Sequence, residues 1–393
     1  MVATRDLQRH SVLPFLLLGF LCLLISPQGN AVVLPEDRSD AMYHLYTGGG
    51  VDIDGPSILV RKQVLEEVSV SANYYIDSIT SASIDVETYA SPYTEERTEY
   101  KFGADYLRNK TLMSVNYTQS DENDFEAKTW SFGLSQDFFG DLTTLTMGYA
   151  RGDDTVGRRD SDFAEDVDRH NYSVGFSQVL TRNMLANLSL NIITDEGYLN
   201  NPYRRVRYLD GNGGQQFQEE VYPRTRTSTA IAARTANYFS NKAGLHTEFR
   251  YFQDTWDIQA FNVQAKYLYP MSLPFYVFDQ ATFEISARYY DQTQAEFYAD
   301  LFPFVNAQNF MARDKEMSTF SNYALGVGID WDFVAGFVEK GSVSLHYTFR
   351  HYDYENFRDA RLSLGEDPQF APGEEPFYDY SASVVRLFVS VWY

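Results

Sequence analysis

Downstream of residue 31 this sequence has no cysteine, because the only one in 393 residues is Cys22. A disulfide-stapled domain is therefore excluded, and so is a C-x-x-C redox motif within the mature chain. Positive charge is also scarce: 32 basic residues stand against 54 acidic ones, for a formal net charge of −22. Nucleic acid is thereby excluded as a partner, since phosphate contacts require clustered lysine and arginine.

Long hydrophobic runs are missing beyond the N-terminus. There, Arg5 and Arg9 precede an apolar run over residues 12–25, and Gly29-Asn30-Ala31 follows it. That run is shorter than the ~20 residues of a membrane-spanning helix, and the small residues suit a cleavage site. We expect residues 1–31 to be a secretory signal peptide. Any membrane crossing in the rest of the chain must then use strands.

Aromatic residues are abundant, at 16% of the chain, and many fall on alternate positions. Between Tyr323 and Phe333 the odd positions are apolar, whereas the even ones are alanine, glycine or aspartate. The same alternation runs through residues 68–77, 283–290 and 343–350. A period of two with one apolar face indicates β-strands.

The connections between the expected strands are unequal in length. Short ones, such as Asn109-Lys110 and Asn241-Lys242, alternate with long ones, such as 195–226 and 291–320. This is typical of a transmembrane barrel with short periplasmic turns and long extracellular loops. We predict an all-β, up-and-down antiparallel barrel of roughly 14 strands over residues 68–393. Residues 32–67, with the run Gly48-Gly49-Gly50, do not fit an even strand number and are expected to form a periplasmic or lumen-entering segment.

The last expected strand alternates apolar residues and finishes on an aromatic one. Val389, Val391 and Tyr393 resemble the signal that the outer-membrane assembly machinery reads. We therefore expect the protein to reside in the cell outer membrane. The expected partners are outer-membrane lipids, lipopolysaccharide and the assembly machinery.

Several stretches resemble the DUF3570 family of Gram-negative outer-membrane barrels with no settled function. The likeness lies in residues 48–62, 69–86, 90–100, 135–149, 193–210 and 312–320. The resemblance implies an outer-membrane barrel. It also implies envelope redox proteins as partners, because family members are encoded near thioredoxin-like proteins and flavin transferases. No haem- or flavin-attachment motif is present in the sequence, so we expect no cofactor.

Charged residues on the expected inner faces are candidates for function. In a water-filled lumen, opposed rows of charge would orient and select polar solutes; alternatively the same residues pair and close the lumen. The two rows comprise Arg234, Arg250, Lys266, Arg288, Arg350 and Arg386, against Glu248, Glu284, Asp330 and Asp332.

Two loops are also candidate binding sites. Tyr203, Arg204, Arg205, Arg207 and Tyr208 could hold an anion or a glycan through arginine forks and aromatic faces; alternatively this loop folds inward as a plug. The acidic loop 121–124 could bind a divalent cation, but it has no D-x-D-x-D-G pattern and we interpret it as solvated. No metal site is predicted.

These features favour a channel or solute-translocating pore of unknown substrate. The alternative is a closed scaffold barrel that anchors envelope partners. An enzyme is disfavoured, because no nucleophile stands at a distinctive spacing from His246 or His346.

Deleting Tyr393, or the substitution Tyr393→Asp, should reduce insertion into the outer membrane, because the terminal aromatic belongs to the expected assembly signal. Heat-modifiable migration on gels reports the folded fraction, and Tyr393→Phe, which keeps the ring, is the matched control. An unchanged folded yield for Tyr393→Asp would remove the role of Tyr393 as a signal.

Overall fold

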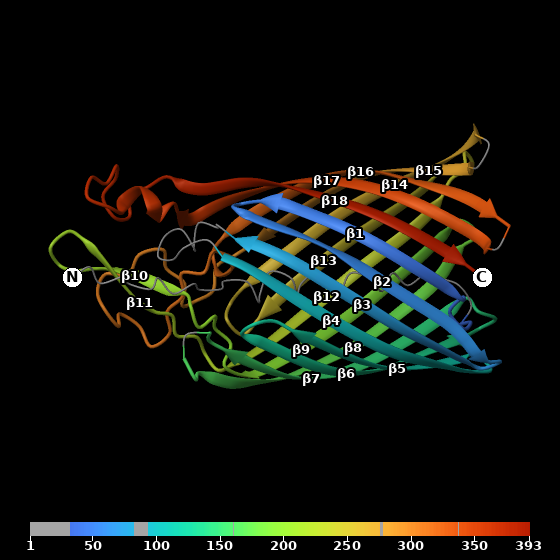
Figure 1. The fold of residues 1–393 in the computed structure, drawn as a ribbon, viewed down its shortest axis with the longest axis horizontal. Helices are drawn as coiled ribbons and strands as arrows, with labels where there is room; N and C mark the ends of the chain where they lie inside the picture. Colours follow the sequence, from blue (N-terminus) through green and yellow to red (C-terminus); the bar gives the residue numbers. More distant parts are fainter. Residues whose placement is uncertain (1–31, 82–92, 160, 276–277, 337) are drawn as a thin grey trace, which may run out of the picture.

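A computed structural model describes residues 32–81, 93–159, 161–275, 278–336 and 338–393 (Figure 1). The expected signal peptide, residues 1–31, lies outside the described residues. Within them, sixteen strands form one closed antiparallel barrel. Those strands are β1 (Arg38–Gly48), β2 (Val51–Leu65), β3 (Val68–Ser81), β4 (Tyr93–Arg108), β5 (Thr111–Asp121), β6 (Phe125–Phe138), β7 (Thr143–Gly157), β8 (Ala164–Thr181), β9 (Met184–Gly197), β12 (Thr225–Tyr238), β13 (Gly244–Asp254), β14 (Gln259–Phe275), β15 (Phe278–Gln292), β16 (Phe320–Ala335), β17 (Val338–Arg358) and β18 (Phe377–Trp392).

Each barrel strand pairs with the next barrel strand in the chain, including those joined by long loops. β9 pairs with β12, because β10 (Arg205–Leu209) and β11 (Gln215–Glu219) form a separate hairpin inside the loop between them. β1 pairs with β18 and closes the barrel. No helix in the described part of the chain is long and apolar enough to cross a membrane. The prediction of an up-and-down antiparallel barrel is confirmed.

The alternation in the sequence sorts the side chains of each strand between the two faces of the barrel. Large apolar residues point outward and stay exposed, as a lipid-facing belt requires. The residues that alternate with them along each strand are mostly small, polar or charged and point inward. The outward set includes Phe102, Trp130, Phe132, Val174, Leu188, Phe249, Ile285, Leu325, Val327 and Leu387, each more than two-fifths exposed.

The strand count corrects the prediction for residues 32–67. They contain two barrel strands, β1 and β2, rather than a periplasmic or lumen-entering segment. The glycine run makes the turn between them, since Gly49 and Gly50 have φ angles of 60° and 77°, a backbone region that glycine enters without strain. Because residues 32–67 add two strands rather than one, the number of barrel strands stays even. The first and the last barrel strand therefore begin and end at the same rim.

The two rims of the barrel differ, and we call them the turn end and the loop end. β1 begins and β18 ends at the turn end, where the connections are short (Figure 1). The long connections 198–224, 293–319 and 359–376 all lie at the loop end. They contain β10, β11 and two short 3-10 helices, η2 (Lys315–Met317) and η3 (Ala360–Ser363). We call these three segments together the cap.

Candidate functional site

The ten residues of the expected charge rows all lie on the inner face of the barrel. Arg250, for example, stands between Phe249 and Tyr251, which are 50% and 37% exposed on the outer face. The register places Arg250 opposite Ala232 on β12 and Asn262 on β14. Arg288 and Arg350 both lie opposite Ala324 of β16, one on each side. The alternation of the sequence thus predicts the face that each of these side chains occupies.

The two charge rows do not oppose each other across the interior. Each of the four acidic members instead pairs with a lysine, arginine or histidine side chain on an adjacent strand. The pairs are Glu248 with Arg234 at 2.5 Å, Glu284 with Lys266 at 2.9 Å, Asp330 with His346 at 3.2 Å and Asp332 with Lys340 at 3.6 Å. Three of these carboxylates are therefore neutralised by a lysine or an arginine along the wall, and the fourth contacts an imidazole ring.

Three of the inward arginines keep an excess of positive charge. Within the described ranges, no carboxylate forms an ion pair with Arg250, Arg288 or Arg386. Arg288 donates from Nε to the side-chain oxygen of Asn262, a neutral partner. We call the inner face of β13 to β18 the basic wall.

The inner face of β5 to β9 is small and largely uncharged in the middle of the strands. The register aligns serine, asparagine, alanine and glycine across these neighbouring strands, and a Cβ added at Gly148 would overlap the hydroxyl of Ser173. In the barrel order β7 stands eight places from β17, half of the circumference. The basic wall therefore faces a neutral one. The neutral residues are Ser114, Asn116, Ser131, Gly133, Gly148, Ala150, Ser173, Gly175 and Ser189.

A second inward cluster, absent from the expected site, joins β1, β3 and β4. The carboxylate of Asp77, which is fully buried, lies 2.9 Å from Nε2 of His44 and 3.1 Å from the guanidinium of Arg97. Tyr75 stacks on the His44 ring with centroids 5.5 Å apart. The alternation around Asp77 indicates its inward face. His44 could not be placed beside it while residues 32–67 were left out of the barrel.

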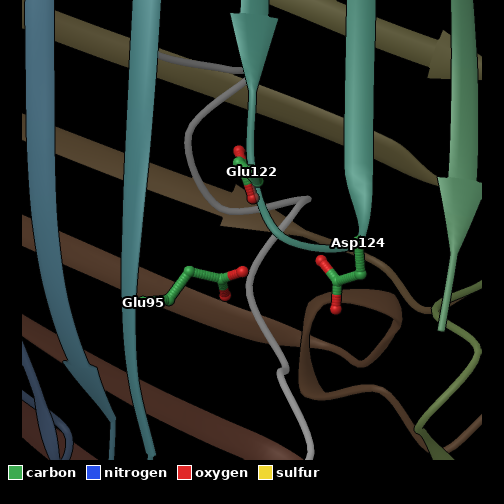
Figure 2. Close-up of side chains that lie close together, drawn as sticks. All are labelled: Glu95, Glu122 and Asp124. Atoms are coloured by element: carbon green, nitrogen blue, oxygen red, sulfur yellow. The ribbon is translucent and has the colours of Figure 1, made fainter. Parts of the chain in front are cut away.

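Three carboxylates gather at the loop end of β4 to β6 (Figure 2). Glu95 lies on β4, and Glu122 and Asp124 lie in the connection from β5 to β6; their nearest oxygens are within 4.8 Å of one another. Arg159 binds Glu95 at 2.9 Å. Burial, followed by the charge of Glu95, raises the pKa of Glu122 to about 8. Such oxygens could hold a hard cation or share a proton. The sequence shows the acidic loop 121–124 but not its proximity to Glu95.

The cap is joined by a buried ion-pair network centred on Arg207. This side chain is fully buried, and it contacts Glu375 at 2.5 Å and the carboxylate of Asp300. Arg207, Asp300 and Glu375 come from the three different segments of the cap. Arg313 binds the other oxygen of Asp300 at 3.0 Å. One arginine therefore ties the three segments together.

The cap is attached to the barrel at two separate places around the mouth. At one place, the hydroxyl of Tyr203 accepts a hydrogen bond from the backbone of Arg159, which in turn holds Glu95 of β4. At the other, Tyr298 and Phe297 share an apolar core with Phe357 of β17. The cap therefore spans the loop end of the barrel (Figure 1).

The loop residues expected to bind an anion or glycan are part of this packing. Arg207 is buried, and Arg204 is 4% exposed and contacts Asp314 at 2.5 Å. Tyr203 is also buried, and Tyr208 bridges to Phe302 within the cap. Only Arg205 is exposed. The five residues do not form one accessible surface, because the cap's own carboxylates already occupy the two buried arginines.

Buried carboxylates in the cap have shifted pKa values. Burial raises the pKa of Glu220 to about 7, and the nearby Asp314 adds to that rise. The hydroxyl of Tyr222 and the backbone N–H of Arg313 both donate to Glu220. Burial also acts to raise the pKa of Glu375, but hydrogen bonds from Arg207 and Ser363 outweigh it and hold that pKa below its usual value. Glu375 is thus ionised within the network.

A closed barrel of sixteen antiparallel strands, with an apolar outer belt and a polar inner wall, is a transmembrane barrel of the outer-membrane type. By its fold, the protein belongs to that class. The family model described as "Protein of unknown function (DUF3570)" matches residues 84–366, and the chain belongs to this family. The resemblance seen in the sequence is confirmed.

The solved structures that the chain resembles are also barrels. A bacterial polysaccharide outer membrane secretin is 9% identical, with a TM-score of 0.49 over 91% of this chain and 99% of that one. A FadL homologue of Pseudomonas aeruginosa is 8% identical, with a TM-score of 0.44 over 90% of each chain. The outer membrane protein opdK of Pseudomonas aeruginosa is 9% identical, with a TM-score of 0.39 over 90% of this chain and 99% of that one. Likeness at this level reaches no further than the fold. A search of curated proteins finds no match.

Arg207→Met should lower the free energy of unfolding by about 3–5 kcal/mol, because Glu375 would stay buried without its counter-charge and Asp300 would keep only Arg313. Urea denaturation in detergent measures the change. The matched control is Arg205→Met, in the same loop but exposed, which should alter stability by no more than about 0.5 kcal/mol. Equal effects of the two substitutions would contradict the central role of Arg207.

Glu122 should make the protein less stable as pH rises. Its pKa goes from the ordinary 4.5 to about 8 on folding, so between those values the folded state binds more protons than the unfolded state, and stability falls with pH. Glu122→Gln should flatten this part of the profile, measured as the urea midpoint between about pH 5 and about pH 9. Glu366→Gln, which removes an exposed carboxylate of the cap, should leave the profile unchanged. A parallel shift at every pH in Glu122→Gln would argue against the raised pKa.

Proposed function

We propose that the protein is an outer-membrane channel that passes small polar solutes and favours anions. The observation that carries this proposal is the basic wall, where Arg250, Arg288 and Arg386 project inward without a carboxylate partner in the described part of the chain. A charge without a counter-charge is expensive in a dry interior. Their placement therefore favours a hydrated lumen.

The size of the barrel supports the same proposal. Eight strands enclose an interior that side chains can fill, whereas barrels of about 16 strands leave room for water. The neutral wall is lined by glycine, alanine and serine, which fill little of that room. Fixed charge on one side of a narrow aqueous path draws ions of opposite sign to that side. Anions would thus follow β13 to β18.

The cap favours a second candidate, the closed scaffold barrel. It spans the loop end, and its core joins Trp256, Phe297 and Phe357 at short ring distances, such as 5.2 Å between Trp256 and Phe297. A cap held this way could close the lumen and present a rigid surface to envelope partners, including redox proteins. Conductance separates the two candidates, because a permanently closed barrel passes no current.

The purified protein should conduct in planar bilayers, with a reversal potential across a salt gradient that favours anions. The double substitution Arg250→Gln and Arg288→Gln should move the reversal potential toward cations, more strongly at low salt, where screening is weak. Arg182→Gln removes an exposed charge from the turn between β8 and β9 and should leave selectivity unchanged.

Absence of current in the parent protein, together with loss of stability in the double variant, would contradict the channel in favour of the scaffold. That combination would mean that the arginines serve a closed, paired interior.

A further inference from the structure

The basic wall contains a strip where the side chains are at their smallest. On β16 the inward positions are Ala324 and then Gly326, and Arg288 and Arg350 lie opposite Ala324 on the two neighbouring strands. Neighbouring strands are about 4.8 Å apart. The Cα atoms of the two arginines are therefore about 10 Å apart across β16, a gap that two extended guanidinium groups can close around a small ligand.

Two hydroxyl groups meet over the adjacent glycine. Ser286 and Thr348 lie opposite Gly326 from β15 and β17. A Cβ at position 326 would overlap the hydroxyl of Ser286 and would lie 3.3 Å from that of Thr348. Within the described ranges neither hydroxyl has a hydrogen-bond partner. The two hydroxyl donors thus converge at Gly326, the next inward position of β16 after Ala324, which lies between the two arginines.

Within the described part of the chain, no carboxylate forms an ion pair with Arg288. The Nε of Arg288 donates to the side-chain oxygen of Asn262, and the Arg288 guanidinium lies 5.6 Å from the centroid of the Tyr290 ring. The terminal nitrogens of Arg288 therefore remain available. The guanidinium of Arg350 repels those of both Arg288 and Arg386. Glu284, the carboxylate next along the wall, is already bound to Lys266.

We propose that Arg288 and Arg350, with the hydroxyls of Ser286 and Thr348, form a binding subsite for an oxyanion on the channel wall. This inference rests on the proposed channel and names the chemical class of its solute: a small molecule that carries a carboxylate or a phosphate. Guanidinium groups bind either anion through paired N–H donors. The two hydroxyls add O–H donors, and the glycine between them leaves space for the anion.

The geometry also explains why the subsite stands on this part of the wall. The next inward residues toward the loop end are Tyr290, Asn322 and Tyr352, which are neutral. Toward the turn end the inward residues include His346 and Arg386, which lie directly opposite each other. An anion that leaves the subsite toward the turn end therefore meets a further cation, whereas the loop end offers aromatic and amide groups.

Isothermal titration calorimetry of the detergent-solubilised protein tests the subsite without requiring conductance. Inorganic phosphate and succinate are the two probes, and at least one of them should bind saturably. Arg350→Gln should weaken that binding at least tenfold, and the double substitution Ser286→Ala with Thr348→Val, which keeps all charges, should weaken it about fivefold. Tighter binding of phosphate assigns a phosphate-bearing solute, and tighter binding of succinate assigns a carboxylate. Arg182→Gln is the control for net charge, and heat-modifiable migration verifies that each variant is folded.

Equal affinity of the parent protein and the Ser286/Thr348 double variant, or no saturable binding of either probe, would overturn the subsite. If current flows in bilayers while neither anion binds, the subsite is wrong and the channel stands. If an anion binds at Arg350 in a protein that passes no current, the channel is wrong and the subsite stands.

Discussion

The hydrogen-bonded seam between β1 and β18 is the contact on which the rest of the structure depends. It pairs eleven residues, Arg38 to Gly48 of β1, with Trp392 to Ala382 of β18. In a bilayer the backbone has no water to bind, so a sheet of strands is tolerated only when its two edges meet. The first hairpin of the described chain therefore completes the barrel, and the inner wall and the loop end take their shape from that closure.

The protein sorts its charges between two environments. Although its net charge is −22, several carboxylates of the inner wall and the cap are held by an arginine: Glu248 by Arg234, Glu375 by Arg207 and Asp77 by Arg97. The arginines of β13, β15 and β18 are the exception, because their cross-strand partners are alanine, asparagine, glutamine or histidine. A positive inner wall in an acidic protein requires this local separation, and in the proposed channel the cap would control access while the wall would select solutes.

Local patterns in the sequence predict the barrel and the inward face of each charged residue, since a period of two needs only a few consecutive residues. They fail where the deciding contact is distant. Arg207 is separated by 93 residues from Asp300 and by 168 from Glu375, so nothing near it distinguishes a buried joint from an exposed anion site. β2 was missed because Asp52, Asp54 and Pro56 interrupt its apolar alternation near the loop end; Asp52 and Pro56 are exposed there. The partners of the acidic rows depend on register, which the sequence alone does not specify.

Cysteine accessibility tests the central claim, a hydrated and positive inner wall, most directly, because the chain has no cysteine after Cys22. Thr348→Cys places one thiol on the inner face of β17, and Leu345→Cys places one on its outer face, where Leu345 is 42% exposed. The account predicts that, in a bilayer, membrane-impermeant thiol reagents modify Thr348→Cys but not Leu345→Cys, and that an anionic reagent reacts faster than a cationic one of similar size. No reaction at Thr348→Cys, or a faster reaction with the cationic reagent, would contradict it.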